Sequence, residues 1–431
     1  MLTPGLKFGD NGHLYIDGCD CVELARKYST PLYVMNESLI RENCKRYKAF
    51  FKENFISGSF PCYASKALSC LEIYRIMNEE GMGVDVVSSG ELYTALKAEF
   101  PAQRIFFHGN NKTQAELKMA LEFGVGRIIV DNLTELSVLN ELAASMNKIA
   151  KIGLRIKPGI EAHTHEYIRT GQIDCKFGFS LENGEAAKAV QLAVQYENVE
   201  LVQVHCHVGS QIFDTEPFCD AVKVMLGFIK EINENMNASV RELNIGGGLG
   251  AKYTDADAPL EIEDYLAPVA DAIKATCAEL NIDVPEFHIE PGRSIVGEAG
   301  TTLYTVGSVK EIEGVRTYVS VDGGMCDNIR YALYKSEYTV LNASKATGDI
   351  SENITIAGKC CESGDLIQEN VELVTPVYGD ILAVLTTGAY NYSMASNYNR
   401  ILRPAMIMVR DGNSRVIIQR ESFEDLLNND I

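Results

Sequence analysis

Residues 104–130, RIFFHGNNKTQAELKMALEFGVGRIIV, hold one copy of the pattern that decides the fold. Short apolar runs at 104–107 and 127–130 flank a stretch, 114–123, whose apolar residues recur with helical spacing. The same alternation repeats along the chain. Runs typical of strands occur at 60–64, 83–87, 104–107, 127–130, 152–156, 201–205, 242–245 and 287–289. Stretches typical of amphipathic helices occur at 91–99, 114–123, 135–146, 184–194, 216–236 and 262–280.

This alternation predicts an α/β fold with a parallel sheet. A doubly wound open sheet produces a similar alternation with fewer strands. Eight strand candidates within about 230 residues favour a closed (β/α)8 TIM-type barrel.

The sequence changes in character after residue 300. Runs typical of strands, broken by Gly, Asp and Asn, occur at 304–312, 317–321, 353–357, 380–385, 404–410 and 415–419, with a helical pattern only at 421–427. The opening segment 7–33 has a similar character. We therefore predict a barrel at 36–300 and a mainly-β domain at 301–431, with the N-terminal segment 1–35 packing against that domain.

Composition excludes several classes of partner. The 431 residues include 39 Lys and Arg against 59 Asp and Glu, a formal net charge of −20, which repels nucleic-acid phosphates and anionic lipids. No run reaches about 18 apolar residues, the length that spans a bilayer. The opening MLTPGLKFGDNGHLYIDG lacks the features of a secretory signal, so we expect a cytoplasmic protein. The 12 cysteines, without a paired CxxC pattern, are expected to be free thiols and not zinc ligands.

Polar residues follow the predicted strands at the end where such barrels place their active sites. Lys66 follows the first strand, either as an ordinary surface lysine or as an amine that acts as a nucleophile. His205 and His207 end the sixth strand two residues apart, so both point to one face. They suit a metal or a flat ring against a ligand, and because the sequence shows no third ligand nearby, we predict no metal site.

The last two strands end in residues suited to an anion and a cation. Gly246, Gly247 and Gly248 form either a tight turn or a cradle whose amides approach a phosphate. Glu290 ends the last strand, and Arg293 follows two residues after Pro291. Arg293 is either the salt-bridge partner of Glu290 or a clamp for an anion. An amine, a flat ring, a phosphate cradle and an acid for a heteroaromatic nitrogen together describe a pyridoxal 5′-phosphate (PLP) site.

The ordered motifs resemble the diaminopimelate decarboxylase family, of the fold-type III PLP group that includes ornithine decarboxylase and alanine racemase. They are YASKA (63–67), GVDVVSSGEL (83–92), HGNNKT (108–113), HTHEYIRTG (163–171), KFGF (176–179), HCHVGSQ (205–211), NIGGGLG (244–250), EPGRSIV (290–296), DGGM (322–325), CESGD (361–365) and GAYNYSMASNYN (388–399). The resemblance implies the barrel, the β domain and a homodimer with active sites shared across the interface. It implies no metal, and no catalytic role for His163 or His165.

The resemblance also implies roles for individual residues. Lys66 holds the cofactor covalently, His207 lies against its ring, and Glu290 keeps the ring nitrogen protonated. The phosphate is held by Ser210, Gly246, Gly247, Gly248, Pro291, Gly292, Arg293 and Tyr390. The distal carboxylate and ammonium of the substrate are held by Arg293, Arg330, Tyr334, Glu362 and Tyr390. Cys361 of the partner subunit protonates the product.

The resemblance implies decarboxylation of meso-2,6-diaminopimelate to L-lysine and CO2, the last step of lysine biosynthesis. Two departures from the family pattern, Tyr331 after Arg330 and Asn391 after Tyr390, leave the substrate less constrained than the reaction. Alternatives are a decarboxylase of D-ornithine or D-lysine, L-ornithine, arginine or carboxynorspermidine, a non-catalytic regulator that keeps the fold, and a racemase. A racemase needs a second base opposite Lys66, which the sequence does not reveal.

Overall fold

The computed structural model describes residues 3–160 and 175–431. His163 and His165 lie outside the described residues. The chain divides into two compact units, and each is described by itself. The barrel unit comprises Asn43–Gly250 and Pro259–Gly292, and the β unit comprises Met1–Glu42, Ala251–Ala258 and Arg293–Ile431.

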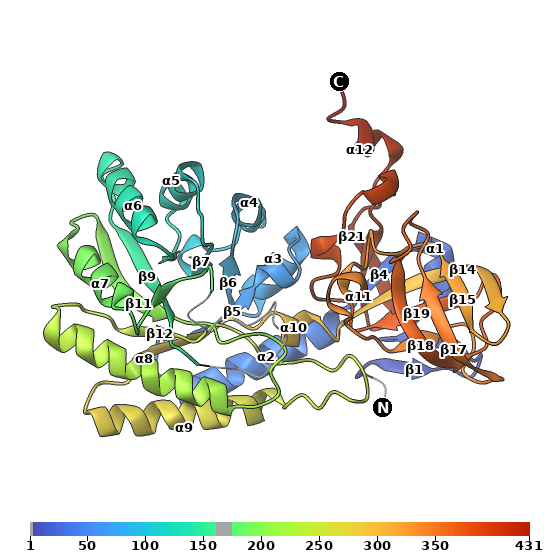
Figure 1. Cartoon of the computed structure of the whole chain (residues 1–431), viewed down its shortest axis with the longest axis horizontal. Helices are drawn as coiled ribbons and strands as arrows, with labels where there is room; N and C mark the ends of the chain where they lie inside the picture. Colours follow the sequence, from blue (N-terminus) through green and yellow to red (C-terminus); the bar gives the residue numbers. More distant parts are fainter. Residues whose placement is uncertain (1–2, 161–174) are drawn as a thin grey trace. The chain divides into compact units, whose positions relative to one another are not determined.

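A closed barrel of eight parallel strands forms the centre of the barrel unit, within the described part of the chain (Figure 1). Pairing runs from the first strand to the eighth, and the eighth strand pairs with the first, which closes the ring. The strands are β5 (Phe60–Ala64), β6 (Gly83–Val86), β7 (Ile105–Phe107), β8 (Arg127–Val130), β9 (Ala150–Lys157), β11 (Val199–His205), β12 (Glu242–Asn244) and β13 (Glu286–Ile289). All eight predicted strands and the predicted closure are confirmed.

Helices follow the strands and lie around the outside of the barrel (Figure 1). They are α3 (Leu71–Glu79), α4 (Ser89–Lys97), α5 (Gln114–Phe123), α6 (Leu133–Ser145), α7 (Glu185–Gln195), α8 (Glu216–Asn235) and α9 (Ile262–Leu280). Side chains that accept from the first-turn amides fix where several begin: Ser88 caps α4, Thr113 caps α5 and Asn132 caps α6. Each cap ends a strand-to-helix loop, so the caps set the lengths of the loops at the mouth of the barrel.

The inside of the barrel holds a buried charged layer near the beginnings of its strands. Arg127 and Glu242, the first residues of β8 and β12, join with Nε 2.7 Å from Oε2. Gln203 donates to the same oxygen at 3.2 Å. Charges inside a protein need such partners, because an unpaired charge there is costly. The charged groups of this layer pair with one another. The polar groups at the other ends of the strands, where the candidate site lies, are therefore not needed to balance them.

The β unit is built on β14 (Gly300–Ile312), which pairs with three other strands. It pairs antiparallel with β15 (Arg316–Val321), β19 (Ile381–Leu385) and β4 (Leu32–Asn36). β4 comes from the N-terminal segment and also pairs parallel with β20 (Ala405–Arg410). The prediction that the N-terminal segment joins the β domain is therefore confirmed.

The β unit also contains elements that complete its sheets and connect them. They are β1 (Leu6–Phe8), β2 (Leu14–Ile16), β3 (Cys19–Asp20), α1 (Cys21–Tyr28), α10 (Arg293–Val296), α11 (Arg330–Tyr334), β16 (Val340–Asn342), β17 (Ile350–Ala357), β18 (Leu366–Val374), β21 (Asn413–Ile418) and α12 (Phe423–Leu427). Helix α2 (Glu37–Asn54) begins in this unit and ends in the barrel unit. Among the described residues we find no helix that is both long enough and apolar enough to cross a membrane.

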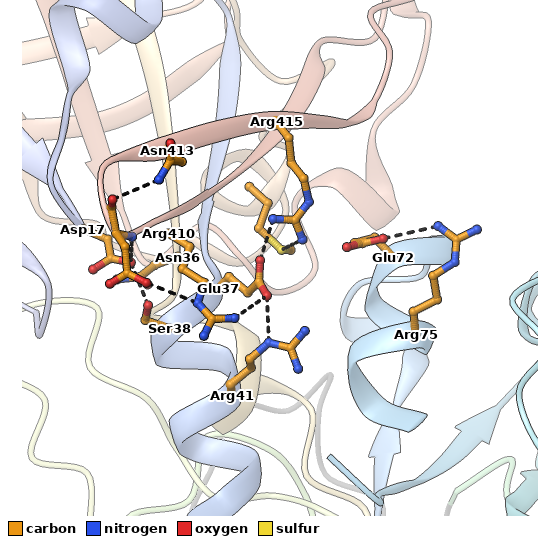
Figure 2. Close-up of polar contacts among 12 residues, drawn as sticks. Asp17, Asn36, Glu37, Ser38, Arg41, Glu72, Arg75, Arg410, Asn413 and Arg415 are labelled. Carbon is orange, nitrogen blue, oxygen red and sulfur yellow. Dashed lines mark hydrogen bonds and ion pairs between the residues drawn. The ribbon is translucent and has the colours of Figure 1, made fainter. Parts of the chain in front are cut away.

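Three arginines hold Glu37, the first residue of α2, inside the β unit (Figure 2). Its Oε1 accepts from Arg41 Nε at 2.7 Å and from Arg410 Nη1 at 3.3 Å, and Arg415 Nη1 lies 2.6 Å from Oε2. Burial alone raises the pKa of this carboxyl, but Arg41 and Arg415 outweigh that effect and lower the pKa below its usual value. Since Arg410 and Arg415 lie in β20 and β21, the cluster joins the two ends of the chain.

Glu37→Gln should lower the free energy of unfolding at pH 7 by about 1.5–3 kcal/mol, the range for a hydrogen bond to a charged group. The folded-state pKa of Glu37 is lowered, so its contribution is complete above the unfolded pKa, about 4.3, and is lost as the pH falls through the folded value. Urea unfolding at pH 7 and at lower pH measures both effects. The control is Glu23→Gln, because Glu23 pairs with Arg26 on the surface with 61% of its side chain exposed. Equal stability of Glu37→Gln and the wild type at pH 7 would contradict the expectation.

Candidate active site

Lys66 lies in a 3-10 turn, Ser65–Ala67, directly after β5. Its Nζ donates to Asp85 Oδ2 at 3.3 Å, and Asp85, in β6, has only 1% of its side chain exposed. The turn is tied to the next loop by Glu91, which accepts from Ser65 Oγ and from the Val87 amide, both at 2.8 Å. The lysine side chain is 41% exposed, so its amine is oriented by a buried acid and remains accessible.

A glycine turn follows β12 and leaves room only for glycine. A Cβ on Gly247 would lie 2.2 Å from the Glu290 carbonyl oxygen. Gly248 has a φ of +139°, and a Cβ there would lie 2.8 Å from the Gly209 carbonyl oxygen. Among the described residues, no hydrogen bond uses the amides of Gly247 or Gly248. Two amides in a turn that a Cβ would fill suit the oxygens of a phosphate group.

The His207 ring lies against this turn. A Cβ on Gly246 would lie 2.7 Å from His207 Nδ1. Burial, together with the positive charges of Lys66 and Arg155, lowers the pKa of His207 well below its usual value. The imidazole is therefore neutral at pH 7 and can present a flat, uncharged ring.

The carboxylate of Glu290, which follows β13, is buried among three side chains. His108 Nε2 lies 2.8 Å from Oε1, Asn244 Nδ2 donates to the same oxygen at 2.8 Å, and His205 Nε2 lies 3.2 Å from Oε2. Burial opposes ionisation of Glu290, but the two histidines outweigh it and hold its pKa well below the usual range. Glu290 is therefore a carboxylate anion within the barrel.

Three of these groups also bring together donor atoms of the kind that bind metal ions. One donor atom each from His108, His205 and Glu290 lies within 4.8 Å of the others. In the sequence, His205 and His207 have no third ligand nearby, so no metal site was predicted. His108 and Glu290 follow other strands, β7 and β13, and barrel closure brings them to His205.

The β unit contains a second cluster, in which two buried arginines meet tyrosine rings. Arg293 Nη1 donates to the Tyr253 hydroxyl, and the Arg293 guanidinium carbon lies 4.8 Å from the centre of the Tyr390 ring. The Arg330 guanidinium carbon lies 5.3 Å from the centre of the Tyr334 ring and 5.8 Å from that of Tyr390. Arginine forks on aromatic faces are suited to binding carboxylates and phosphates.

Cys361 and Glu362 lie in the loop between β17 and β18 and are exposed. All twelve cysteines belong to the described part of the chain, and Cys361 is the exposed one. Its amide donates to Asn399 Oδ1 at 2.6 Å, which fixes the loop. Neither the Cys361 thiol nor the Glu362 carboxylate forms a hydrogen bond or ion pair with a described residue, so both are free to meet a ligand.

Comparison with known proteins identifies the family. Residues 37–297 match the family model described as pyridoxal-dependent decarboxylase, pyridoxal binding domain. The diaminopimelate decarboxylase of Bacillus subtilis is 49% identical to this chain over 424 residues, covering 98% of this chain and 96% of that one. The chain belongs to the diaminopimelate decarboxylase family. The diaminopimelate decarboxylase of Staphylococcus aureus is 46% identical to this chain over 426 residues, covering 99% of each chain.

Solved structures of diaminopimelate decarboxylases share the fold throughout. The crystal structure of the M. jannaschii enzyme in co-complex with L-lysine has a TM-score of 0.92 and 38% sequence identity, covering 100% of this chain and 99% of that one. Lysine/ornithine decarboxylase from Vibrio vulnificus, at 22% identity and a TM-score of 0.76, shows the fold alone.

The two departures from the diaminopimelate decarboxylase pattern are accommodated inside the β unit. The Tyr331 hydroxyl donates to Glu369 Oε2 at 2.6 Å, and Glu369 pairs with Arg316 at 2.8 Å. Asn391 is fully buried and bonds through Nδ2 to the Tyr338 hydroxyl at 3.3 Å. Tyr331 therefore ties α11, the helix that begins with Arg330, to β18.

Residues with close contacts at the barrel mouth were missed as site residues by the sequence reasoning. Asp85 lies in β6, His108 directly follows β7 and Asn244 ends β12, where active-site groups of barrels occur. Their positions at strand ends were visible in the sequence. The signal was a polar residue at the end of an apolar run, and in each case it stood inside a quoted motif.

Proposed function

We propose that this chain removes CO2 from the D-configured centre of meso-2,6-diaminopimelate and yields L-lysine. The observation that carries the proposal is the joint placement, on one barrel mouth, of an amine beside a buried acid, a glycine turn with open amides and an anionic Glu290. Relatives of nearly full length, all diaminopimelate decarboxylases, support it.

The barrel residues fit PLP. Lys66 would hold the cofactor covalently, His207 would lie against its ring, and Glu290 would meet its ring nitrogen. Ser210, Gly246, Gly247, Gly248, Pro291 and Gly292 would hold its phosphate. When bound, PLP supplies an electron sink for the carbanion that is left as CO2 departs.

The protein's own groups keep protons where this chemistry needs them. Glu290, as an anion, would keep a proton on the ring nitrogen of PLP. Neutral His207 would orient the ring without adding a competing charge. Asp85 accepts a hydrogen bond from the Lys66 amine at 3.3 Å and so orients the group that would hold the cofactor.

The β-unit residues supply the proposed substrate recognition. Arg293 and Tyr390 are proposed for the phosphate and the substrate, and Arg330 and Tyr334 for the distal carboxylate. Glu362 would meet the distal ammonium. Arginine pairs with carboxylates through two parallel hydrogen bonds, so it is suited to the group that distinguishes diaminopimelate from simpler diamino acids.

We further propose a homodimer in which Cys361 of the partner subunit protonates the product. The exposure of Cys361 in the single chain and the absence of a described partner for its thiol support this assignment. A cytoplasmic location stays a prediction from the sequence.

Gly247→Ala should lower the affinity for PLP by about ten- to a hundredfold, because displacing the turn costs at least one hydrogen bond to a charged phosphate. The new Cβ would lie 2.2 Å from the Glu290 carbonyl oxygen and must displace the turn. Titration of the apoprotein with PLP, followed by absorbance, measures the loss. The control is Gly227→Ala, because Gly227 lies in α8 with nothing within 4 Å of an added Cβ. Unchanged affinity in Gly247→Ala would remove the turn from the phosphate site.

Relative turnover on several amino acids tests the proposed substrate. We expect the cofactor-loaded protein to decarboxylate meso-diaminopimelate much faster than D-ornithine, D-lysine, L-ornithine, arginine or carboxynorspermidine. Arg330→Ala should reduce this preference, because it removes the cation for the distal carboxylate. Faster turnover of a substrate without a distal carboxylate would overturn the assignment and keep the reaction type.

A further inference from the structure

The carboxylate of Glu290 has an unequal set of partners on its two oxygens. Oε1 meets two nitrogens at 2.8 Å, from His108 and Asn244, whereas Oε2 meets one, from His205, at 3.2 Å. We propose that His108, His205 and Asn244 are positioning residues that hold Glu290 as an anion and leave one acceptor position open, on Oε2, for a ring N–H. The inference rests on the proposed function, in which Glu290 meets the ring nitrogen of PLP.

The protonation state of His205 follows from its burial. His205 is fully buried, its Nε2 faces Glu290, and its Nδ1 has no hydrogen-bond partner among the described residues. A buried N–H without an acceptor costs more than a buried lone pair, so the proton belongs on Nε2 and Nδ1 carries the lone pair. Burial also lowers the pKa of His205 to about 3, so the ring is neutral. His205 is therefore a neutral donor to Oε2.

Asn244 has only one orientation that satisfies both of its neighbours. Its Oδ1 accepts from the Gly246 amide at 2.9 Å, so its amide nitrogen must face Glu290 Oε1. The same side chain therefore fixes Oε1 and the first residue of the glycine turn. This links the position of the acid to the position of the proposed phosphate cradle.

An ionised carboxylate can accept about four hydrogen bonds. Two positions are taken by hydrogen bonds from Asn244 and His205, and His108 Nε2 lies 2.8 Å from Oε1. On the Oε2 side, where the partner is the neutral His205, the anion still lacks a cation in a buried setting, where a poorly compensated charge is costly. A heteroaromatic ring with a protonated nitrogen supplies both the missing donor and the missing charge.

A divalent cation is the competing occupant, since His108, His205 and Glu290 gather within 4.8 Å. The observed contacts favour the hydrogen-bonded arrangement. His205 Nε2 forms a hydrogen bond with Oε2, and Asn244 donates to Oε1 through its amide nitrogen, which is not a metal ligand.

The test compares PLP with its analogue in which carbon replaces the ring nitrogen, each titrated into the apoprotein and followed by absorbance. His205→Leu removes the donor, whereas His205→Gln keeps an amide N–H near the position of Nε2. Wild type should bind PLP more tightly than the analogue. His205→Leu should weaken PLP binding by about ten- to a hundredfold, the effect of one hydrogen bond to a charge, and leave binding of the analogue unchanged.

His205→Gln should retain the preference of the wild type for PLP over the analogue. His108→Gln should retain this preference too, and circular dichroism checks that each variant is folded. Equal weakening of both ligands in His205→Leu would show a merely structural role and overturn the inference. An unchanged preference in His205→Leu, or a stoichiometric divalent metal in the wild type that this variant loses, would also overturn it. Wild type that binds neither ligand would overturn the proposed function itself.

Discussion

Replacing Lys66 with alanine should abolish the release of CO2 from meso-diaminopimelate. The amine is the proposed covalent attachment point of PLP, and it is the only group that Lys66→Ala removes from the barrel mouth. Borohydride reduction of the PLP-treated protein, followed by intact mass, should show a bound cofactor in the wild type and none in the variant. CO2 release by the two proteins gives the loss of turnover directly.

Lys118→Ala is the matched control for this experiment. Lys118 lies in α5 with 60% of its side chain exposed and pairs at 3.8 Å with Glu122. It should behave as the wild type in both measurements. Ordinary turnover in Lys66→Ala, or covalent trapping of PLP by that variant, would contradict the role of Lys66.

Cys361→Ala should lower kcat by about 10²- to 10⁴-fold, the range for removing a positioned proton donor. Affinity for PLP should not change, because the thiol has no part in holding the cofactor. The control is Cys219→Ala, which removes a partly buried thiol of α8 in the barrel unit. An unchanged kcat in Cys361→Ala would remove this cysteine from the proton-donor role.

Mixing the two inactive variants tests whether the subunits share their active sites. In a mixed dimer one site combines the intact Lys66 of one chain with the intact Cys361 of the other. Random exchange should therefore restore about a quarter of the wild-type activity. A mixture that stays inactive after exchange would show that the two residues act within one chain.

The barrel was predictable because its strands are short apolar runs that alternate with amphipathic helices. The predicted range 262–280 coincides with α9, and 60–64 coincides with β5. Helix α2 and strand β18 were missed for different reasons. In α2, ESLIRENCKRYKAFFKEN, the buried residues Ile40, Cys44, Tyr47 and Phe51 recur with helical spacing, so the sequence carried a signal that was overlooked. In β18, LIQENVELV, polar residues break the apolar run.

The sequence predicted only those residues of the candidate site that directly follow an apolar run typical of a strand. Lys66, the glycine turn and Glu290 each follow an apolar run, and their residue types suggested chemistry. The partners of Glu290 could not be found this way, because His205 lies 85 residues from it and meets it only when the barrel closes. Sequence spacing along one strand suggested pairing His205 with His207, whereas the fold pairs His205 with residues of other strands.

Incubation of the purified, cofactor-loaded protein with meso-diaminopimelate, with CO2 and L-lysine measured together, tests the central claim most directly. We predict equal amounts of the two products. CO2 without lysine would contradict the substrate assignment. No CO2 from meso-diaminopimelate, although PLP is covalently bound, would contradict the proposed reaction on this substrate.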